Sequence, residues 1–392
     1  MVVREAHVFR EKQGIDLRTG HRVDRIDPAK RRVAGVRSDG GRFEVDYDKL
    51  LLATGASPVV PDLPGFDLPG VMVLKTLDDG RKLKRFLGEQ HVERALIVGM
   101  GYIALEMCET LRTLGIDTAM VKPRPVFLPW AHRKLAERVQ REVEENGVRL
   151  ILGQEVLRIE AEDGALQAHC TEDVVDVDLV LVAIGVKPCS ELAAEAGLEL
   201  GPGEAIAVDR SMRTSAPDIY AAGDCADAYH VVTGEKTWIP LALRANRAGW
   251  AVADHVSGQR VSLDGVAGTS VFKVFDMQVA RTGLTAKEAS KAGFDPVEVA
   301  IEASSRAHSH SGASPLLVQM VGDRASGRLL GAQIVGREGA AHRVNGPAVA
   351  LHQQMTVAAY SQCDLAYAPP FGPTWDPTLV AANQLLKKLE DG

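Results

Sequence analysis

A glycine-rich run at residues 99–104 is the first part of the sequence whose spacing predicts a chemistry. It reads G-M-G-Y-I-A, follows an apolar stretch and opens a helical pattern. In this setting the first glycine permits a tight turn, the second lets the backbone approach a pyrophosphate, and the small sixth residue lets the helix pack against the strand. The free N–H groups at the helix N-terminus attract phosphates. A plain glycine-rich turn is the alternative. The residues expected to contact a dinucleotide are Gly99, Gly101, Tyr102, Ile103 and Ala104.

The strand after this helix ends in a basic segment that bears on the choice of nucleotide. Lys122 and Arg124 stand about 20 residues beyond the glycine turn, where an acidic residue would bind the ribose 2′-hydroxyl of NAD. A cation there favours a 2′-phosphate by charge pairing. We therefore expect Lys122 to bind the nucleotide and NADPH to be preferred. NADH stays open, because the two side chains could also form a solvated face at the end of the sheet.

These residues need a sheet to position them, and the sequence predicts one. Between residues 78 and 152, helical patterns alternate with apolar strands, which is typical of a parallel sheet covered by helices on both faces. Before it, residues 21–45 show the alternation and turns of an antiparallel meander. We also expect a short strand at 15–18, and a proline-rich irregular connection at 56–70. A further domain of strands and helices follows a boundary near 262–268.

Length and composition exclude several classes of protein. The chain has 392 residues, 46% of them hydrophobic, and a formal net charge of -7, which suits two to three globular domains. Because no excess of positive charge is available for a phosphate backbone, we expect no nucleic-acid partner. No apolar stretch reaches the roughly 20 residues of a membrane span, so we expect no membrane partner. Five cysteines without a C-x-x-C pair favour a reducing cytoplasm.

Several segments, taken in their order along the chain, resemble one known family. They are L-L-A-T-G-A-S-P at 51–58, the G-x-G segment with Tyr102 and Glu106, L-V-A-I-G-V-K-P at 181–188 and T-S-A-P-D-I-Y-A-A-G-D at 214–224. Their order resembles that of the flavin-dependent pyridine nucleotide-disulfide oxidoreductases. The run D-L-A-Y-A-P-P-F-G-P-T-W-D-P at 364–377 resembles the coenzyme A-disulfide reductase branch, whose relatives include NADH oxidases and persulfide reductases. The resemblance covers essentially the whole chain.

The resemblance implies an α/β fold with two Rossmann-like nucleotide-binding domains and a C-terminal α+β dimerisation domain. The FAD domain would be incomplete and split in sequence by the NAD(P)H domain. The implied segments are 1–77 and 206–265 for the two parts of the FAD domain, 78–205 for the NAD(P)H-binding domain and 266–392 for the interface domain. A homodimer is implied with them.

By the same resemblance, the FAD site takes residues from both parts of its domain. Asp224 would hydrogen-bond the ribityl chain. A helix that begins at Leu241 and Ala242 would point at the flavin ring, where reduced flavin accumulates negative charge. From the residues alone, Gly223-Asp224 could equally be a turn with an Asx cap. The other residues expected near the cofactors are Thr54, Gly55, Gly185 and Gly223.

Three side chains take catalytic or gating positions by resemblance. Tyr102 would cover the flavin until nicotinamide displaces it, and the carboxylate of Glu106 would reach toward the N5 side of the flavin. Tyr367 would be presented to the partner's active site, where its phenol could donate a proton to a leaving thiolate. The alternatives are a packed helix aromatic for Tyr102, an exposed helix glutamate for Glu106 and an interface tyrosine for Tyr367.

Two elements of the family have no counterpart in the sequence. They are the first strand, glycine turn and helix that bind the ADP half of FAD, and the redox-active cysteine that follows. We therefore expect the chain to start inside the FAD domain and to bind flavin weakly or not at all.

None of the five cysteines is expected to take the redox position. Cys108 and Cys225 are predicted to be small packing residues, and Cys170, Cys189 and Cys363 have no evident partner. His308 and His310 lie in a Ser- and Gly-rich loop without further ligands, so we expect no metal site.

The expected function is that of an NAD(P)H-dependent oxidoreductase of the coenzyme A-disulfide reductase type. Hydride would pass from NAD(P)H to FAD, and electrons would pass on to a small-molecule disulfide or persulfide. An NADH oxidase or persulfide reductase of the same fold is the first alternative. A dimeric fragment that binds NAD(P)H without turnover is the second, and the activity of the chain is open between these readings.

Overall fold

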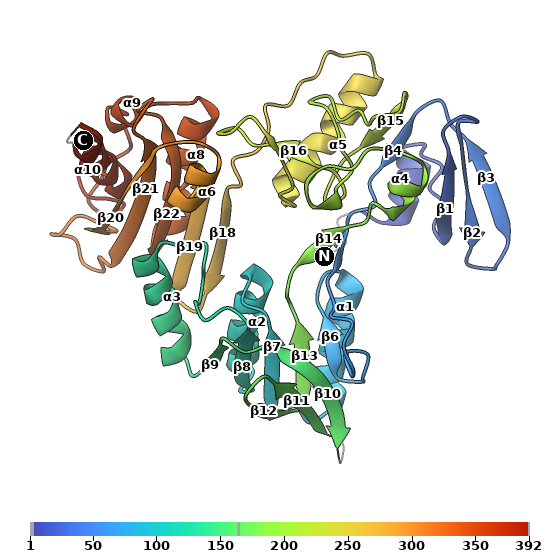
Figure 1. Cartoon of the computed structure of the whole chain (residues 1–392), viewed down its shortest axis with the longest axis horizontal. Coiled ribbons are helices and arrows are strands. Elements are labelled where there is room, and N and C mark those ends of the chain that lie inside the picture. The colour runs from blue at the N-terminus through green and yellow to red at the C-terminus, as the bar shows by residue number, and fades with distance from the viewer. Residues whose placement is uncertain (1–3, 163–164, 391–392) are drawn as a thin grey trace. The chain divides into compact units, whose positions relative to one another are not determined.

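The computed structural model describes residues 4–162 and 165–390 (Figure 1). The chain divides into two units. Unit 1 comprises Met1–Ala56, Pro188–Ala228 and Lys236–Leu263, and unit 2 comprises Ser57–Lys187, Tyr229–Glu235 and Asp264–Gly392. Both units therefore combine segments that are far apart in the sequence. The division into four functional segments stays a prediction.

A five-stranded parallel sheet lies within unit 2, with the strand order β6-β13-β7-β8-β9. Its central strands are almost wholly apolar and buried, as expected where both faces are covered. One face packs on the helices of residues 77–145, but the other packs on the antiparallel strands of residues 156–177, so the expectation of helices on both faces is wrong. The predicted alternation of helices and strands is confirmed. The elements are β6 (Val71–Val73), α1 (Leu77–Glu89), β7 (Arg94–Val98), α2 (Tyr102–Thr113), β8 (Asp117–Lys122), α3 (Arg133–Glu145), β9 (Arg149–Leu152) and β13 (Leu179–Val182).

Two antiparallel sheets complete unit 2. A three-stranded sheet of β10 (Val156–Glu162), β11 (Ala165–Cys170) and β12 (Val174–Val177) precedes β13. The C-terminal part is a five-stranded sheet with the order β18-β19-β22-β21-β20. Its strands are β18 (Ser270–Val274), β19 (Met277–Gly283), β20 (Pro296–Ser304), β21 (Pro315–Asp323) and β22 (Leu329–Gly336). Its helices are α6 (Ala286–Lys291), α7 (Ala340–Arg343), α8 (Asn345–His352), α9 (Val357–Ser361) and α10 (Pro377–Glu390).

Unit 1 contains the predicted meander and a short parallel pair. The meander is β1 (His21–Asp27), β2 (Arg32–Arg37) and β3 (Arg42–Asp46). The parallel pair joins β4 (Leu50–Leu52) to β15 (Ile219–Ala221), and α5 (Ala242–Val256) contributes buried side chains to the same core. The other short elements of the chain are η1 (Val8–Lys12), β5 (Ala56–Pro58), β14 (Val186–Pro188), α4 (Glu191–Glu195), η2 (Pro202–Glu204), β16 (Ala228–Tyr229) and β17 (Lys236–Thr237).

Two expectations about local structure are wrong. Residues 15–18 form no strand, because their backbone N–H groups bond locally, from Ile15 to Phe9 and from Leu17 to Ile15, rather than to a neighbouring strand. The connection 56–70 is not wholly irregular, because it begins with β5, which pairs with β14. Proline is tolerated at the end of such a two-stranded ribbon, where no ladder hydrogen bond is required of it. Among the described helices, none has the length and apolar character that crossing a membrane requires.

Candidate cofactor sites and catalytic side chains

The glycine turn of unit 2 has the geometry of a dinucleotide-binding turn. Gly99 follows β7 directly with a φ of 115°, a region that L side chains rarely adopt. A Cβ atom there would lie 2.4 Å from the carbonyl oxygen of Ala183. Only glycine therefore allows the turn to pass so close to the neighbouring strand. Ala104, on the first turn of α2, is completely buried, as the predicted close helix packing requires.

Gly101 leaves an open, uncapped helix end. It is the N-cap of α2, makes no side-chain cap, and no acidic residue lies in the first turn. A Cβ atom at Gly101 would meet no protein atom within 4 Å. The first N–H groups of the helix thus face free space where a phosphate could approach. This arrangement fits a pyrophosphate.

The turn lies where the strand order of the sheet reverses. β7 continues through β8 to β9 on one side, and β13 lies on its other side. Ligands of open α/β sheets bind at the carboxyl ends of the strands at such a point. Gly185 lies in the turn three residues beyond β13 and is exposed. The structure therefore brings Gly99 and Gly185 to the same edge of the sheet.

Lys122 occupies the position next to this turn. It is the last residue of β8, and the N–H of Gly99 donates to the carbonyl of Val121 at 2.9 Å. Burial lowers the pKa of Lys122, and the nearby Arg124 lowers it further. Two cations therefore lie near the end of β8, with Lys122 half-buried and Arg124 exposed. The arrangement suits a 2′-phosphate.

Tyr102 and Glu106 lie on α2, which is docked on β18. The Tyr102 hydroxyl lies 3.1 Å from Ser270 Oγ, and its ring packs on Phe272 with centroids 5.2 Å apart. Glu109, farther along α2, accepts the N–H of Phe275 at 2.8 Å. Glu106 is exposed, and partial burial of its carboxyl, together with Glu109, raises its pKa. The catalytic role of Glu106 and the gating role of Tyr102 stay predictions.

The residues expected to hold FAD converge at one edge of unit 1. Because β4 and β15 are parallel, their carboxyl ends meet at the same edge. Thr54 and Gly55 follow β4, and Gly223 and Asp224 follow β15. A Cβ atom at Gly55 or Gly223 would meet no protein atom within 4 Å. The edge is therefore open to a ligand.

The N-terminus of α5 lies at this same edge. Leu241 is the N-cap, as predicted, and provides no side-chain cap, and no acidic residue lies in the first turn. Arg244 in that turn donates to the carbonyl of Gly223 at 2.8 Å. The helix end is thus tied to the turn that carries Asp224. A positive helix end beside a carboxylate and open glycines fits a flavin nucleotide.

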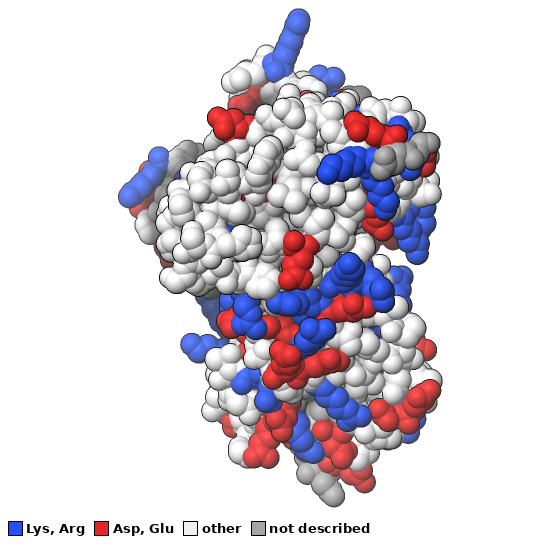
Figure 2. All heavy atoms as spheres, turned by 90° about the vertical axis from the view of Figure 1, so that its left-hand side faces the viewer, with Lys and Arg blue, Asp and Glu red and all other residues white. Residues whose placement is uncertain are grey.

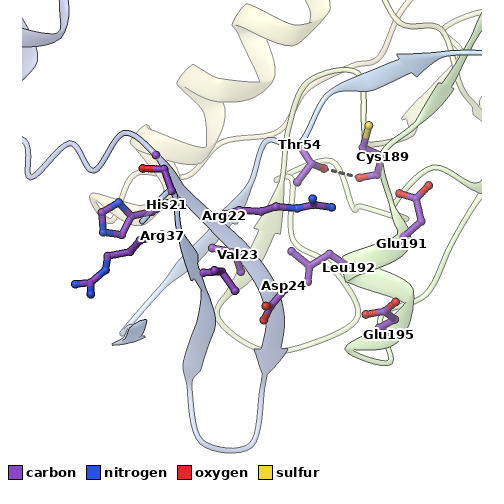
Figure 3. Close-up of a pocket in the computed structure, with 13 residues that line it drawn as sticks. His21, Arg22, Val23, Asp24, Arg37, Thr54, Cys189, Glu191, Leu192 and Glu195 are labelled. Atoms are coloured by element: carbon purple, nitrogen blue, oxygen red, sulfur yellow. Dashed lines mark hydrogen bonds between the residues drawn. The ribbon is translucent and has the colours of Figure 1, made fainter. Parts of the chain in front are cut away.

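A cavity of about 1060 Å³ adjoins this edge in unit 1. It lies between β1, β2, Thr54, Cys189 and α4 (Figure 3). Thr54 Oγ1 donates to the carbonyl oxygen of Cys189 at 2.5 Å. Figure 3 shows Arg22 extending from β1 toward the side of the cavity where Cys189 and Glu191 lie. The cavity has the size of a cofactor pocket, and Arg22 adds a cation that a phosphate could use.

Tyr367 lies on an exposed loop of the C-terminal part and is 49% exposed. Arg343 holds this loop, because it donates to the carbonyl of Phe371 at 2.8 Å and forms a largely buried ion pair with Asp376 at 2.8 Å. Phe371 and Trp375 are 79% and 58% exposed. Figure 2 shows few charged side chains over the upper part of this side of the molecule. The loop is therefore fixed while its aromatic side chains stay accessible.

Two of the five cysteines lie where packing residues are expected. Cys108 and Cys225 are completely buried, and burial raises the pKa of Cys108 to about 12. Cys170 is buried, and Cys189 and Cys363 are partly exposed. No redox cysteine is assigned among them. Within the described residues, no group of three or more metal-ligating side chains gathers at one place, and His308 and His310 belong to none.

Sequence reasoning missed two side chains that shape the unit 1 site. Arg244 and Trp238 both donate to carbonyls of the turn at Gly223 and Asp224. Arg244 lies two residues after Ala242, where the helix was predicted to begin, so the sequence could have placed it in the first turn of α5. The sequence could not show that its guanidinium reaches back to Gly223.

The comparisons with known proteins agree on one family. A family model described as "Pyridine nucleotide-disulphide oxidoreductase" matches residues 2–249, and the model of the dimerisation domain of the same family matches residues 269–377.

Individual relatives cover nearly the whole chain. The NAD(P)H sulfur oxidoreductase (CoA-dependent) of Pyrococcus furiosus is 35% identical over 96% of this chain and 85% of its own length. An NADH oxidase of Methanocaldococcus jannaschii is 33% identical over 98% of this chain and 85% of its own length. The solved structure of an NAD-dependent persulfide reductase from A. fulgidus superposes with a TM-score of 0.95. That protein is 34% identical to this chain, and the match covers 99% of this chain and 72% of the other. These similarities confirm the α/β fold with a C-terminal dimerisation domain.

Proposed function

Since the chain belongs to the pyridine nucleotide-disulphide oxidoreductase family, we propose that it is a flavin-dependent NAD(P)H oxidoreductase of the coenzyme A-disulfide reductase type. The reaction would convert NAD(P)H, a proton and a disulfide to NAD(P)⁺ and two thiols, so two electrons leave as hydride and break one S–S bond. The observation that carries the proposal is the pair of open glycine edges, one in each unit, at the carboxyl ends of parallel strands. FAD, when bound, supplies the hydride acceptor.

The residues of the chain would share the work between binding and proton transfer. In unit 2, Gly99, Gly101 and the N-terminus of α2 would bind the nucleotide pyrophosphate, and Lys122 would bind the 2′-phosphate of NADPH. The carboxylate of Glu106 would reach toward the N5 side of the flavin, and Tyr102 would cover the flavin until nicotinamide displaces it. In unit 1, the residues that would hold FAD are Thr54, Gly55, Gly223, Asp224, Leu241 and Ala242.

The C-terminal part supports a second element of the proposal, a homodimer. The exposed aromatic loop around Tyr367 lies within the dimerisation domain. In a dimer, Tyr367 would reach the partner's active site and donate its phenol proton to a leaving thiolate. A small-molecule disulfide or persulfide is the proposed substrate. The cytoplasmic location stays a prediction.

NADPH oxidation by the purified chain with added FAD tests the proposal directly. We expect turnover with coenzyme A disulfide or polysulfide, and Tyr367→Phe should lower kcat by about a hundredfold or more. The matched control is Tyr47→Phe, because the Tyr47 hydroxyl has no hydrogen-bond partner among the described residues.

The alternatives give different results in the same assay. Oxygen consumption without disulfide dependence would indicate an NADH oxidase, as in the relative from M. jannaschii. NADPH binding without flavin binding or turnover would indicate the non-catalytic dimer. FAD titration of the chain measures how tightly the flavin binds.

A further inference from the structure

A buried arginine bridges both ends of the turn that carries Asp224. Arg244 is 7% exposed and lies in the first turn of α5. Its Nη1 donates to the carbonyl oxygen of Gly223 at 2.8 Å, and its Nη2 donates to the carbonyl oxygen of Asp227. One guanidinium therefore holds the turn at residue 223 and again at residue 227.

The segment before α5 adds two more donors to the same turn. Trp238 Nε1 donates to the carbonyl oxygen of Asp224 at 2.8 Å. Lys236 Nζ lies 2.7 Å from Asp227 Oδ1, which also accepts the N–H of Val208 at 3.0 Å. Side chains thus hold three backbone carbonyls of residues 223–227. All of these bonds come from the protein itself, so they stabilise the turn without a ligand.

Packing of the first turn of α5 does not by itself require a charged side chain at residue 244. Its Nε is buried and has no hydrogen-bond partner among the described residues, and the nearby carboxylate of Asp227 is bonded through Oδ1 to Lys236. Taking a guanidinium out of water costs free energy that its bonds to carbonyls offset only in part. An apolar side chain would pack the first turn of α5 without this cost. The role of the arginine is therefore to hold the turn at residues 223–227.

We infer that Arg244 is a positioning residue for FAD. By holding residues 223 and 227, it fixes the Asp224 turn relative to the N-terminus of α5, so that both can contact one flavin nucleotide. This inference rests on the proposed function, because FAD is the ligand it assigns to the edge. No motif of the sequence assigns Arg244 this role.

The test compares Arg244→Lys with Trp238→Phe and a matched control. Lysine keeps the charge but cannot donate to two carbonyls with a fixed fork. We expect the FAD dissociation constant, measured by flavin fluorescence, to rise about tenfold in R244K and about threefold in W238F. The control is Arg210→Lys, another arginine of unit 1 that donates to a carbonyl, that of Leu263, away from the turn.

Two further readouts separate positioning from general destabilisation. The NADPH dissociation constant should stay within about twofold of the wild-type value in R244K, because that site lies in unit 2. Hydrogen exchange of residues 223–228 without flavin should speed up in R244K but not in R210K. An R244K chain that matches the wild type in FAD affinity or in this exchange would overturn the inference, as would an equal loss in R210K.

The design also distinguishes failure of the inference from failure of the proposed function. If the wild-type chain binds no FAD, the flavin-dependent function is contradicted, and so is the assignment of Arg244 to flavin. Faster hydrogen exchange in R244K would then still show that the hydrogen bonds of Arg244 order the turn. If the wild type binds FAD and R244K binds it equally well, the proposed function stands and the inference alone fails.

Discussion

Replacing Lys122 by glutamate should change the preference of the chain from NADPH to NADH. Lys122 ends β8 beside the glycine turn, and Arg124 is the second cation at the edge. A hydrogen bond between charged groups contributes about 1.5–3 kcal/mol, which corresponds to roughly 10- to 150-fold in affinity. Because Arg124 remains, we expect a loss of about tenfold for Lys122→Gln. In Lys122→Glu, the repulsion between the introduced carboxylate and a 2′-phosphate should extend the loss to about a hundredfold.

Calorimetric titration of the chain with NADPH and NADH measures this change without any need for flavin. NADH should bind the K122E variant at least as well as the wild type, because a carboxylate can accept from the ribose 2′-hydroxyl. The control is Lys84→Glu, an exposed lysine on α1 with the same charge change. If NADPH affinity falls by less than about threefold, or falls equally in K84E, the assignment of Lys122 is refuted.

The pH dependence of NADPH binding follows from the same residue. Burial and Arg124 lower the pKa of Lys122, so its amine loses its proton at a lower pH than an exposed lysine does. Pairing with the phosphate requires the charged form. NADPH affinity should therefore weaken as pH rises toward this lowered pKa, and K122Q should remove that part of the dependence.

Three further substitutions test the glycine turn and a buried histidine. Gly101→Val should leave the melting temperature nearly unchanged, because its side chain enters free space, but should weaken NADPH binding by about tenfold or more. Gly99→Ala should instead destabilise unit 2 by about 2 kcal/mol or more, because its Cβ would meet the carbonyl of Ala183 at a positive φ. Burial lowers the pKa of His230 to about 4, so its unfolded form binds more protons below about pH 6.5. The free energy of unfolding should then fall by about 3 kcal/mol from about pH 6.5 to about pH 4, and His230→Gln should flatten this slope in urea titrations.

A specific result would contradict each of these three predictions. A Gly101→Val chain that unfolds easily, or a Gly99→Ala chain as stable as the wild type, would show that the two glycines are not divided into a ligand role and a packing role. For His230, an unchanged acid slope in the glutamine variant would show that other groups cause the acid sensitivity.

The parallel sheet of unit 2 was predictable because its strands and helices can each be recognised from a short stretch of sequence. Its strands are short apolar runs separated by helical patterns, and burial on both faces leaves that signature in any window of the sequence. The glycine turn was predictable for the same reason, because Gly99 and Gly101 stand between one strand and one helix. The structure confirms both.

Two missed elements of the C-terminal part did carry a signal. β20 reads P-V-E-V-A-I-E-A-S, with apolar and polar residues in alternation over part of its length, which is typical of a strand with one solvated face. α10 begins at Pro377 after Asp376, and Asp-Pro is a common helix start. Here the prediction was incomplete although the residues supported it.

The unit 1 site could not be predicted from short stretches of sequence, because it depends on contacts between distant segments. The strand expected at 15–18 did not form, because a strand needs a partner and none is paired with it among the described residues. The convergence of Thr54 with Asp224 was implied only by the family resemblance. The hydrogen bonds of Arg244 to the turn depend on side-chain geometry, which spacing cannot supply.

The parallel pairing of β4 with β15 has a consequence for synthesis of the chain in the cell. Leu50 and its partner Ile219 are separated by about 170 residues, which a ribosome needs roughly ten to thirty seconds to add. The parallel sheet of unit 2 lies wholly inside that interval and can form during it. β4, with Leu51 42% exposed even in the finished protein, must wait unpaired meanwhile. The edge at which Thr54 and Asp224 lie therefore forms after the parallel sheet of unit 2, and β4 presents unpaired backbone groups until translation has passed Ile219.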